Sequence, residues 1–352
     1  MIPRLEIHFD REERRWFREG MAMNDKMSRA NALNELRSLI DREEFLLNHC
    51  RSGIQLVLQA LDLKPLTGVG MIVYNCHTVM NAICQAGCKP VFVDVTDGMT
   101  IDMEDLARKR EQMQVLIVTH LFGIVNDVKE IKRRYPDLIV IEDCAHCFEH
   151  KIDGDFGVYS VGQGKFPSIG DGGVLRTIED FRLKIEELYA QLPEYSKKQE
   201  RKLYVRLWMK AMMYSPCFYW LTRKLKRKRG EMDVREEVTM RKMSRGIANI
   251  LAHKRAEYPA AVKERLQRAQ HKGEGLKVNG EWLVGENAFM ALVRCEDPAA
   301  LKAVYAAKGI ETETHFKHCI EWAEQFGYER GDCPNAEELT KHLLMIPTYT
   351  SI

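Results

Sequence analysis

The order of apolar and polar residues in the first half of the chain alternates between two patterns. Short, continuous apolar runs rich in β-branched residues occur at 71–74, 90–95, 115–119 and 138–141. Between them, segments such as 79–86 and 128–134 space their apolar residues as helices do. Continuous apolar strands are typical of sheets buried on both faces, so the pattern predicts an α/β fold with a mostly parallel sheet between helices.

Polar residues follow several of these runs. Asp94, His120 and Asp143 each stand just after or at the end of a predicted strand. Ligands of open α/β sheets bind beyond the carboxyl ends of the strands, so we expect a functional site there.

The second half of the chain predicts a smaller unit. A helix over 243–258 is followed by segments at 288–294, 298–308 and 337–344 that suggest an α+β domain. We therefore expect a large domain over 1–245 and a small C-terminal domain over 246–352. The large domain would carry a basic and aromatic helical insertion at about 191–237.

Composition narrows the class of protein. The 352 residues are 45% hydrophobic and 30% charged, as in ordinary globular proteins, and the net charge of +2 gives no reason to expect nucleic-acid binding. No run is long enough to span a membrane, and the first residues lack the apolar core of a signal peptide. Ten scattered cysteines suit reduced thiols, so we expect a cytoplasmic protein.

The insertion combines cations with aromatic residues, most densely over 197–229. One interpretation is a set of helices packed over a dimer or domain junction with solvated basic faces, and this is favoured. The other is weak association with an anionic membrane surface.

An acid and a lysine carry the most specific chemistry. Asp143 ends the run 138–143, and Lys165 follows a second apolar segment. A carboxylate opposite a pyridine nitrogen and an amine that reaches an aldehyde are what a protein needs to hold pyridoxal 5′-phosphate.

Further features fit the phosphate of that cofactor. Ser52, Gly53 and Ile54 precede a helical pattern, where backbone N–H groups favour an anion. Ser160 could bring a hydroxyl to the same phosphate. The glycines of segment 170–173 let the chain turn back into a strand.

From about Asn31 onward the chain resembles the DegT/DnrJ/StrS family of sugar aminotransferases, which have the fold of type I pyridoxal-phosphate enzymes. The matching motifs lie at 52–54, 86–95, 120–123, 142–146, 160–165, 333–339 and 345–349. The resemblance implies that Lys165 binds the cofactor covalently and moves a proton, and that Asp143 pairs with the ring nitrogen. It also implies that His146 contacts the phenolic oxygen of the ring. Ser160, Ser52, Gly53 and Ile54 would hold the phosphate, and no metal is implied.

The chain departs from the family pattern at several positions. Relatives commonly have threonine where Ile54 stands. The aromatic residue that stacks on the ring is either Tyr74 or His77, with His77 favoured, and an asparagine from a second subunit has no clear match over 239–244. The chain ends soon after Tyr349. His315 and His318 are further candidates for substrate contact.

The resemblance implies a homodimeric aminotransferase. It would move an amino group from an amino acid, glutamate in the family pattern, to a nucleotide-linked keto-sugar for polysaccharide, lipopolysaccharide or glycoconjugate synthesis. Lys165 argues against the dehydratases of the family, which have histidine there. Two alternatives stay open: a non-catalytic or regulatory protein of the same fold, and a metal-binding protein that uses Cys144, His146 and Cys147.

Overall fold

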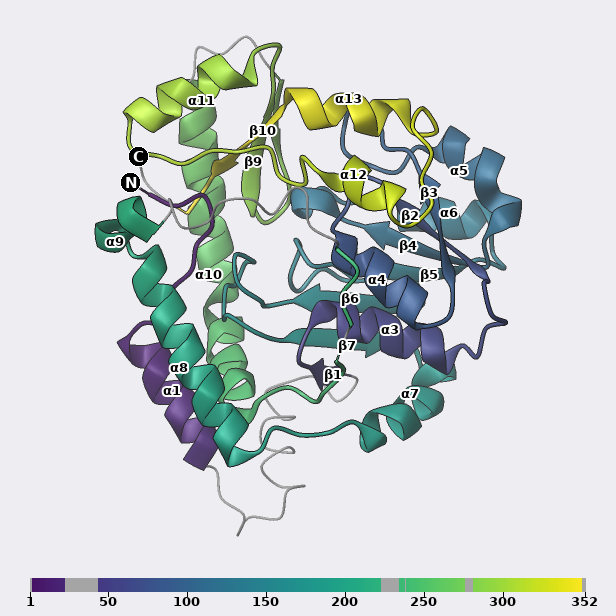
Figure 1. Ribbon diagram of the computed structural model, residues 1–352, viewed down its shortest axis with the longest axis horizontal. Helices are drawn as coiled ribbons and strands as arrows, with labels where there is room; N and C mark the ends of the chain where they lie inside the picture. The colour runs from purple at the N-terminus through teal and green to yellow at the C-terminus, as the bar shows by residue number, and fades with distance from the viewer. Residues whose placement is uncertain (1, 23–43, 223–233, 238, 276–280, 350–352) are drawn as a thin grey trace.

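The computed structural model describes residues 2–22, 44–222, 234–237, 239–275 and 281–349 (Figure 1). Within these residues, a large sheet with helices packed on it occupies one side of the molecule. A three-stranded sheet lies beside it, and the long helix α10 (Arg245–Gly275) connects the two regions in sequence.

The large sheet has seven described strands in the order β1-β7-β6-β5-β4-β2-β3. The strands β2 to β6 pair in parallel, whereas β7 pairs antiparallel with both β6 and β1. This confirms the predicted α/β class with a mostly parallel sheet. The strand bounds are Glu44–Leu47 (β1), Gly68–Ile72 (β2), Lys89–Val93 (β3), Val115–Thr119 (β4), Ile139–Cys144 (β5), Phe156–Ser160 (β6) and Gly173–Thr177 (β7).

Burial explains why these strands form where they do. Every residue of β2, β4 and β6 is buried, as expected for strands covered by helices on both faces. The covering helices include α3 (Cys50–Ala60), α4 (His77–Gln85), α5 (Met103–Lys109), α6 (Val128–Arg134) and α7 (Glu179–Gln191). Short 3-10 turns, η1 (Arg110–Gln112) and η2 (Leu121–Gly123), flank β4.

The predicted insertion is helical in its described part. It contains the end of α7, then α8 (Lys197–Tyr214) and α9 (Pro216–Thr222), while residues 223–233 lie outside the described part of the chain. Ser196 and Gln199 form a reciprocal capping box that starts α8. In Figure 1, α8 runs along one edge of the molecule beside α1 (Arg11–Ala22) and α10.

The C-terminal region contains a sheet ordered β10-β9-β8, formed by β8 (Glu281–Val284), β9 (Met290–Arg294) and β10 (Leu343–Pro347). The helices α11 (Pro298–Ala307), α12 (Cys319–Glu324) and α13 (Pro334–His342) complete it. The chain start also joins this region, because Ile2 N–H donates to Gly309 O at 2.7 Å. The domain boundary near 245 stays a prediction. Residue 2 contacts the C-terminal region, although it belongs to the predicted large domain.

A seam of charged hydrogen bonds joins the two regions. The carboxylate of Asp94, which follows β3, accepts the N–H groups of Asn335 and Ala336 at 3.0 and 2.8 Å. Lys109 Nζ lies 2.8 Å from Asp332 Oδ2, just before the same helix. Asp94 therefore caps the first turn of α13.

None of the described helices combines the length and the apolar composition needed to cross a bilayer.

Candidate active site

A pocket of about 340 Å³ lies at the carboxyl ends of β4, β5 and β6. Five of the residues singled out from the sequence line it: Ile54, Asp143, His146, Ser160 and Lys165. The strand-end position agrees with the site predicted from the sheet pattern.

Asp143 is buried at the end of β5, in the parallel pairing with β4. Its Oδ1 accepts the N–H of Ala145 at 3.0 Å and lies 3.7 Å from Cys50 Sγ, and its Oδ2 is 3.5 Å from Thr119 Oγ1. Burial raises the pKa of Asp143, and the nearby Lys165 ammonium opposes that rise. Because its protein partners are few, the carboxylate is stabilised best by a cationic partner inside the pocket.

His146 follows two residues later and is fixed in one tautomer. Its Nδ1 accepts the backbone N–H of Phe122 at 3.0 Å, so the ring proton must be on Nε2. That Nε2 is buried and has no hydrogen-bond partner among the described residues. Burial, together with the charge of Lys165, lowers the pKa of His146 well below its usual value. The side chain is therefore a neutral donor, stacked on Phe289 with ring centroids 4.6 Å apart.

Lys165 and Ser160 complete this side of the pocket. Ser160 ends β6, and its hydroxyl oxygen accepts the N–H of Gly162 at 3.4 Å. Lys165 lies in the following turn, with its N–H bonded to Gly162 O at 3.2 Å, and its side chain is half-buried. The fold therefore brings an amine, a carboxylate and a neutral imidazole together around one pocket.

The start of α3 lines the pocket, but not through all the residues that the sequence suggested. The helix begins at Cys50, earlier than predicted, and His49, Cys50 and Arg51 line the pocket together with Ile54. The hydroxyl of Ser52 donates instead to Asn48 Oδ1 at 2.9 Å.

Gly53 serves the packing of α3 on the sheet. A Cβ at this position would stand 3.0 Å from Val158 Cγ1 and 3.5 Å from Leu47 Cδ1. Ser52 and Gly53 do not line the pocket, because the Ser52 hydroxyl is bonded to Asn48 and Gly53 packs against the sheet.

The predicted stacking residue also lies elsewhere. His77 begins α4 and packs against Trp322, with ring centroids 4.9 Å apart, and it does not line the pocket. Tyr74 is fully buried and donates to His315 O at 2.6 Å. The pocket is lined instead by their neighbours Asn75, Cys76, Thr78 and Val79.

A second wall of the pocket was not foreseen. Asp171, in the glycine-rich turn before β7, accepts from Arg206 of α8 at 2.7 Å, and its other oxygen lies 3.1 Å from His49 Nδ1. Lys210 of α8 donates to Gln163 at 2.6 Å. Arg206 and Lys210 both line the pocket, so the insertion supplies part of the site. Their spacing of one helical turn was the available signal.

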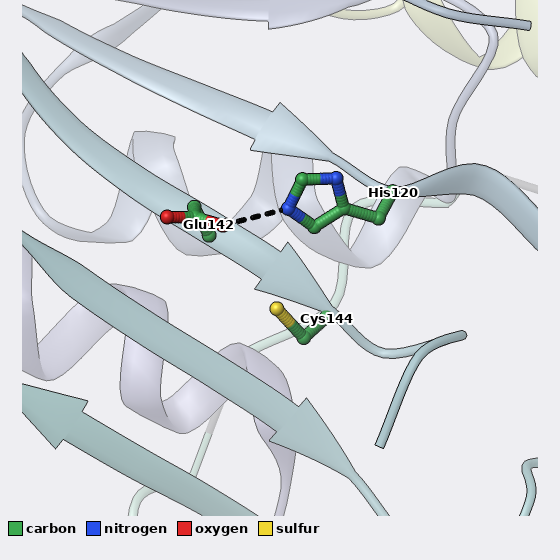
Figure 2. A group of neighbouring side chains, drawn as sticks. All are labelled: His120, Glu142 and Cys144. Atoms are coloured by element: carbon green, nitrogen blue, oxygen red, sulfur yellow. Dashed lines mark hydrogen bonds and ion pairs between the residues drawn. The ribbon is translucent and has the colours of Figure 1, made fainter. Parts of the chain in front are cut away.

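The metal-site alternative joined Cys144, His146 and Cys147, which the structure does not gather as a ligand set. Figure 2 shows a different buried group, made of His120, Glu142 and Cys144. His120 Nε2 is 2.8 Å from Glu142 Oε2.

Protein partners already satisfy the polar atoms of this group. His120 Nδ1 accepts the N–H of Asn126 at 3.1 Å, and Glu142 Oε1 accepts those of Asp153 and Gly154 at 2.6 and 2.5 Å. We interpret the group as a hydrogen-bonded network that joins β4 to β5 and fixes the strand that carries Asp143.

These residues fit pyridoxal phosphate. The buried carboxylate of Asp143 suits a protonated ring nitrogen, the unpartnered Nε2–H of His146 suits a phenolic oxygen, and Lys165 supplies an amine in the same pocket. The mostly parallel sheet, with the site at the strand ends, is that of the fold type I pyridoxal-phosphate enzymes.

Comparison of the sequence with known protein families identifies the family of this chain. Residues 34–352 match the model of the DegT/DnrJ/EryC1/StrS aminotransferase family, so the chain belongs to that family and is a pyridoxal-phosphate-dependent sugar aminotransferase by class. The family assignment supports the enzyme hypothesis.

The chain is also similar to individual proteins. Protein MJ1066 of Methanocaldococcus jannaschii is 26% identical over 86% of this chain and 80% of its own length. The UDP-N-acetyl-3-dehydro-alpha-D-glucosamine 3-aminotransferase of Acidithiobacillus ferrooxidans is 33% identical, over 37% of this chain and 39% of its own. The structure is similar to Spr1654 of Streptococcus pneumoniae, a proposed sugar aminotransferase in its PMP form. The TM-score is 0.76 at 16% identity, over 100% of this chain and 95% of that one.

Proposed function

We propose that this enzyme transfers an amino group from glutamate to a nucleotide-linked keto-sugar. The observation that carries the proposal is the grouping of Lys165, Asp143 and His146 in one pocket of a chain from a sugar aminotransferase family. Relatives of this chain include an enzyme named for a UDP-linked sugar and one named GDP-perosamine synthase, which supports a nucleotide-linked acceptor.

The roles of the residues follow from their chemistry. Pyridoxal phosphate, when bound, supplies the aldehyde that takes up the amino group and a ring that accepts an electron pair. Asp143 would hold the proton on the ring nitrogen, and Nε2–H of His146 would donate to the phenolic oxygen. Lys165 Nζ would anchor the cofactor and then move a proton at the substrate carbon that gains or loses the amine.

The phosphate would lie at the start of α3. Ser160 offers a hydroxyl, the first turn of α3 offers N–H groups at its positive end, and Arg51 adds a cation. Ile54 would contribute its backbone and an apolar contact. In this proposal Ser52 and His77 support the pocket from outside rather than touching the cofactor.

We further infer a homodimer in the cytoplasm, acting in the synthesis of a polysaccharide, lipopolysaccharide or other glycoconjugate. The family supports these assignments, and all ten cysteines are free thiols, as a reducing compartment requires.

The test is a two-step spectroscopic assay. Glutamate added to the yellow enzyme should bleach the visible absorbance of the cofactor, and a panel of keto-sugar nucleotides should then restore it with one member of the panel. Wild-type enzyme that bleaches with glutamate but is restored only by simple 2-keto acids would contradict the sugar assignment. The variant K165A, which should show neither change, is the matched control.

A further inference from the structure

The outer face of α8 and α9 exposes large apolar side chains. On α8, Val205, Trp208, Met209, Met212 and Met213 are between 40% and 50% exposed, and on α9 Phe218 and Leu221 are 53% and 54% exposed. We call these seven residues the α8–α9 apolar face. The spacing of the α8 members puts them on one side of the helix.

The opposite side of α8 accounts for its attachment to the protein. Leu203 and Leu207 are buried there, and Glu200 beside them accepts from Ser244 Oγ and from the N–H of Arg245. The apolar face is therefore not the side with which α8 holds on to the fold. Leu183 on α7 is 81% exposed but stands alone, so it shows what an isolated apolar side chain looks like here.

Cations lie at one end of the apolar face. Lys197, Lys198, Arg201 and Lys202 precede it on exposed positions of the same helix. Over its whole length α8 carries six Lys and Arg and one Glu, so its net charge is 6 − 1 = +5, and the one acid is buried. The exposed surface is therefore cationic at one end and apolar at the other.

This charge distribution decides between the surfaces that could cover the face. A second copy bound through a two-fold axis would bring the same helix against the face, and that helix offers no exposed acid to the cations of α8. A nucleic acid would pair with the cations but leave the apolar side chains in water. An anionic bilayer satisfies both parts, because its head groups attract the cations while the apolar side chains enter the interface.

We propose that the α8–α9 apolar face docks this enzyme on an anionic membrane surface. The contact is peripheral, since no described helix could span the bilayer. It also bears on the active site, because α8 lines the pocket with Arg206 and Lys210 on a flank next to the docking face. The enzyme would then work with its pocket beside the lipid head groups, which goes beyond the proposed transamination and does not depend on the sugar.

Vesicle flotation of the full chain tests the proposal. Vesicles of phosphatidylcholine mixed with phosphatidylglycerol should carry the protein to the top of a density gradient, and pure phosphatidylcholine should bind it at least about tenfold more weakly. Raising the salt concentration should weaken the binding, since the attraction between exposed charges is screened. Wild-type protein that stays at the bottom with anionic vesicles at low salt overturns the proposal.

Two variants separate the contributions. The variant K198E/R201E/K202E should lose most of its preference for anionic lipid, at roughly fivefold or more per cation. The variant W208E/M212E should lose binding to both kinds of vesicle. The control L183E introduces an acid at an exposed apolar site away from the face and should bind as the wild type does. Circular dichroism spectra show whether each variant is folded.

Coverage of the face by a second copy of the chain would give different results. If a second copy covers the face, W208E/M212E should convert a dimer into a monomer in light-scattering measurements, and wild-type protein should ignore vesicles. Quenching of Trp208 by brominated lipid gives an independent readout: part of the quenching should disappear in W208F, which keeps the apolar character and should still float. Equal quenching in W208F and the wild type would contradict insertion of this face.

Discussion

The two walls of the pocket are built in opposite ways. The strand-end wall, with Asp143 and His146, is buried, and its side chains are oriented by backbone N–H groups. The α8 wall is exposed at Arg206, whose side chain is 53% accessible, and its two pocket-lining side chains are each held by one partner, Asp171 for Arg206 and Gln163 for Lys210. Chemistry that needs fixed proton positions belongs to the first wall, and recognition that can adapt belongs to the second.

The largest effect is expected from removing the amine of Lys165. K165A should lose at least about 10⁴-fold in transamination rate, because it removes both the covalent anchor and the proton carrier. Steady-state kinetics and the loss of visible absorbance measure this. K210A, on the α8 wall, is the matched control and should keep its colour, so equal effects of the two variants would contradict the division of roles.

The carboxylate of the strand-end wall should matter next most. D143N should reduce kcat by about 10²–10³-fold, as is typical when a fixed electrostatic partner in an active site is removed. Bound cofactor, followed by absorbance, should persist because Lys165 is retained. D171N, on the other wall, should change KM more than kcat, and the reverse pattern would place the ring nitrogen elsewhere.

His146 and His315 should each make the apoprotein less stable in acid. Burial lowers the pKa of His146 and of His315 below 6.5, so in acid the unfolded chain takes up protons that the folded chain does not. Between about pH 7.5 and pH 5.5 each should cost about 1 kcal/mol of unfolding free energy. His120 contributes in the opposite direction, because its contacts with Cys144 and Glu142 raise its pKa to about 10 despite its burial.

Urea unfolding at the two pH values measures this loss. H146Q should remove about half of the part due to the two histidines. An H146Q variant with the pH dependence of the wild type would mean that His146 is protonated in the folded state.

The smallest effect should come from the exposed ion pair. R206Q should lower the unfolding free energy by less than about 1 kcal/mol, because half of the Arg206 side chain is in water. Its effect should appear in KM for the acceptor instead. Chemical denaturation and substrate titration compare the two, and a loss of stability larger than that of H146Q would show that the α8 wall is part of the core.

The sequence was informative where burial controls the pattern. Asp143, Ser160 and Lys165 follow buried strands, and a continuous apolar run fixes where such a strand ends, so their meeting at one edge was predictable. The helix start at Cys50 was less predictable, because Ser52 and Gly53 look like a cap. In the structure the Ser52 hydroxyl donates to Asn48, and Gly53 packs closely against the sheet.

Other features depend on packing between distant segments. His77 was expected at the ring because aromatic residues stack there in relatives, but Trp322 from the C-terminal region packs against it. The contact of Arg206 with Asp171 joins residues 35 positions apart through an insertion that has no strand pattern. Only the folded arrangement shows that this insertion forms a wall of the pocket.

Asp94 ties the two regions of the molecule in a way that limits how they can move. Because its carboxylate holds both first amides of α13, a swing of the C-terminal region as a rigid flap would break two charge-assisted bonds at once. Any closing of the pocket around a sugar should therefore leave this corner fixed as a pivot. The displacement would be concentrated in the loop that carries Phe316, which lines the pocket.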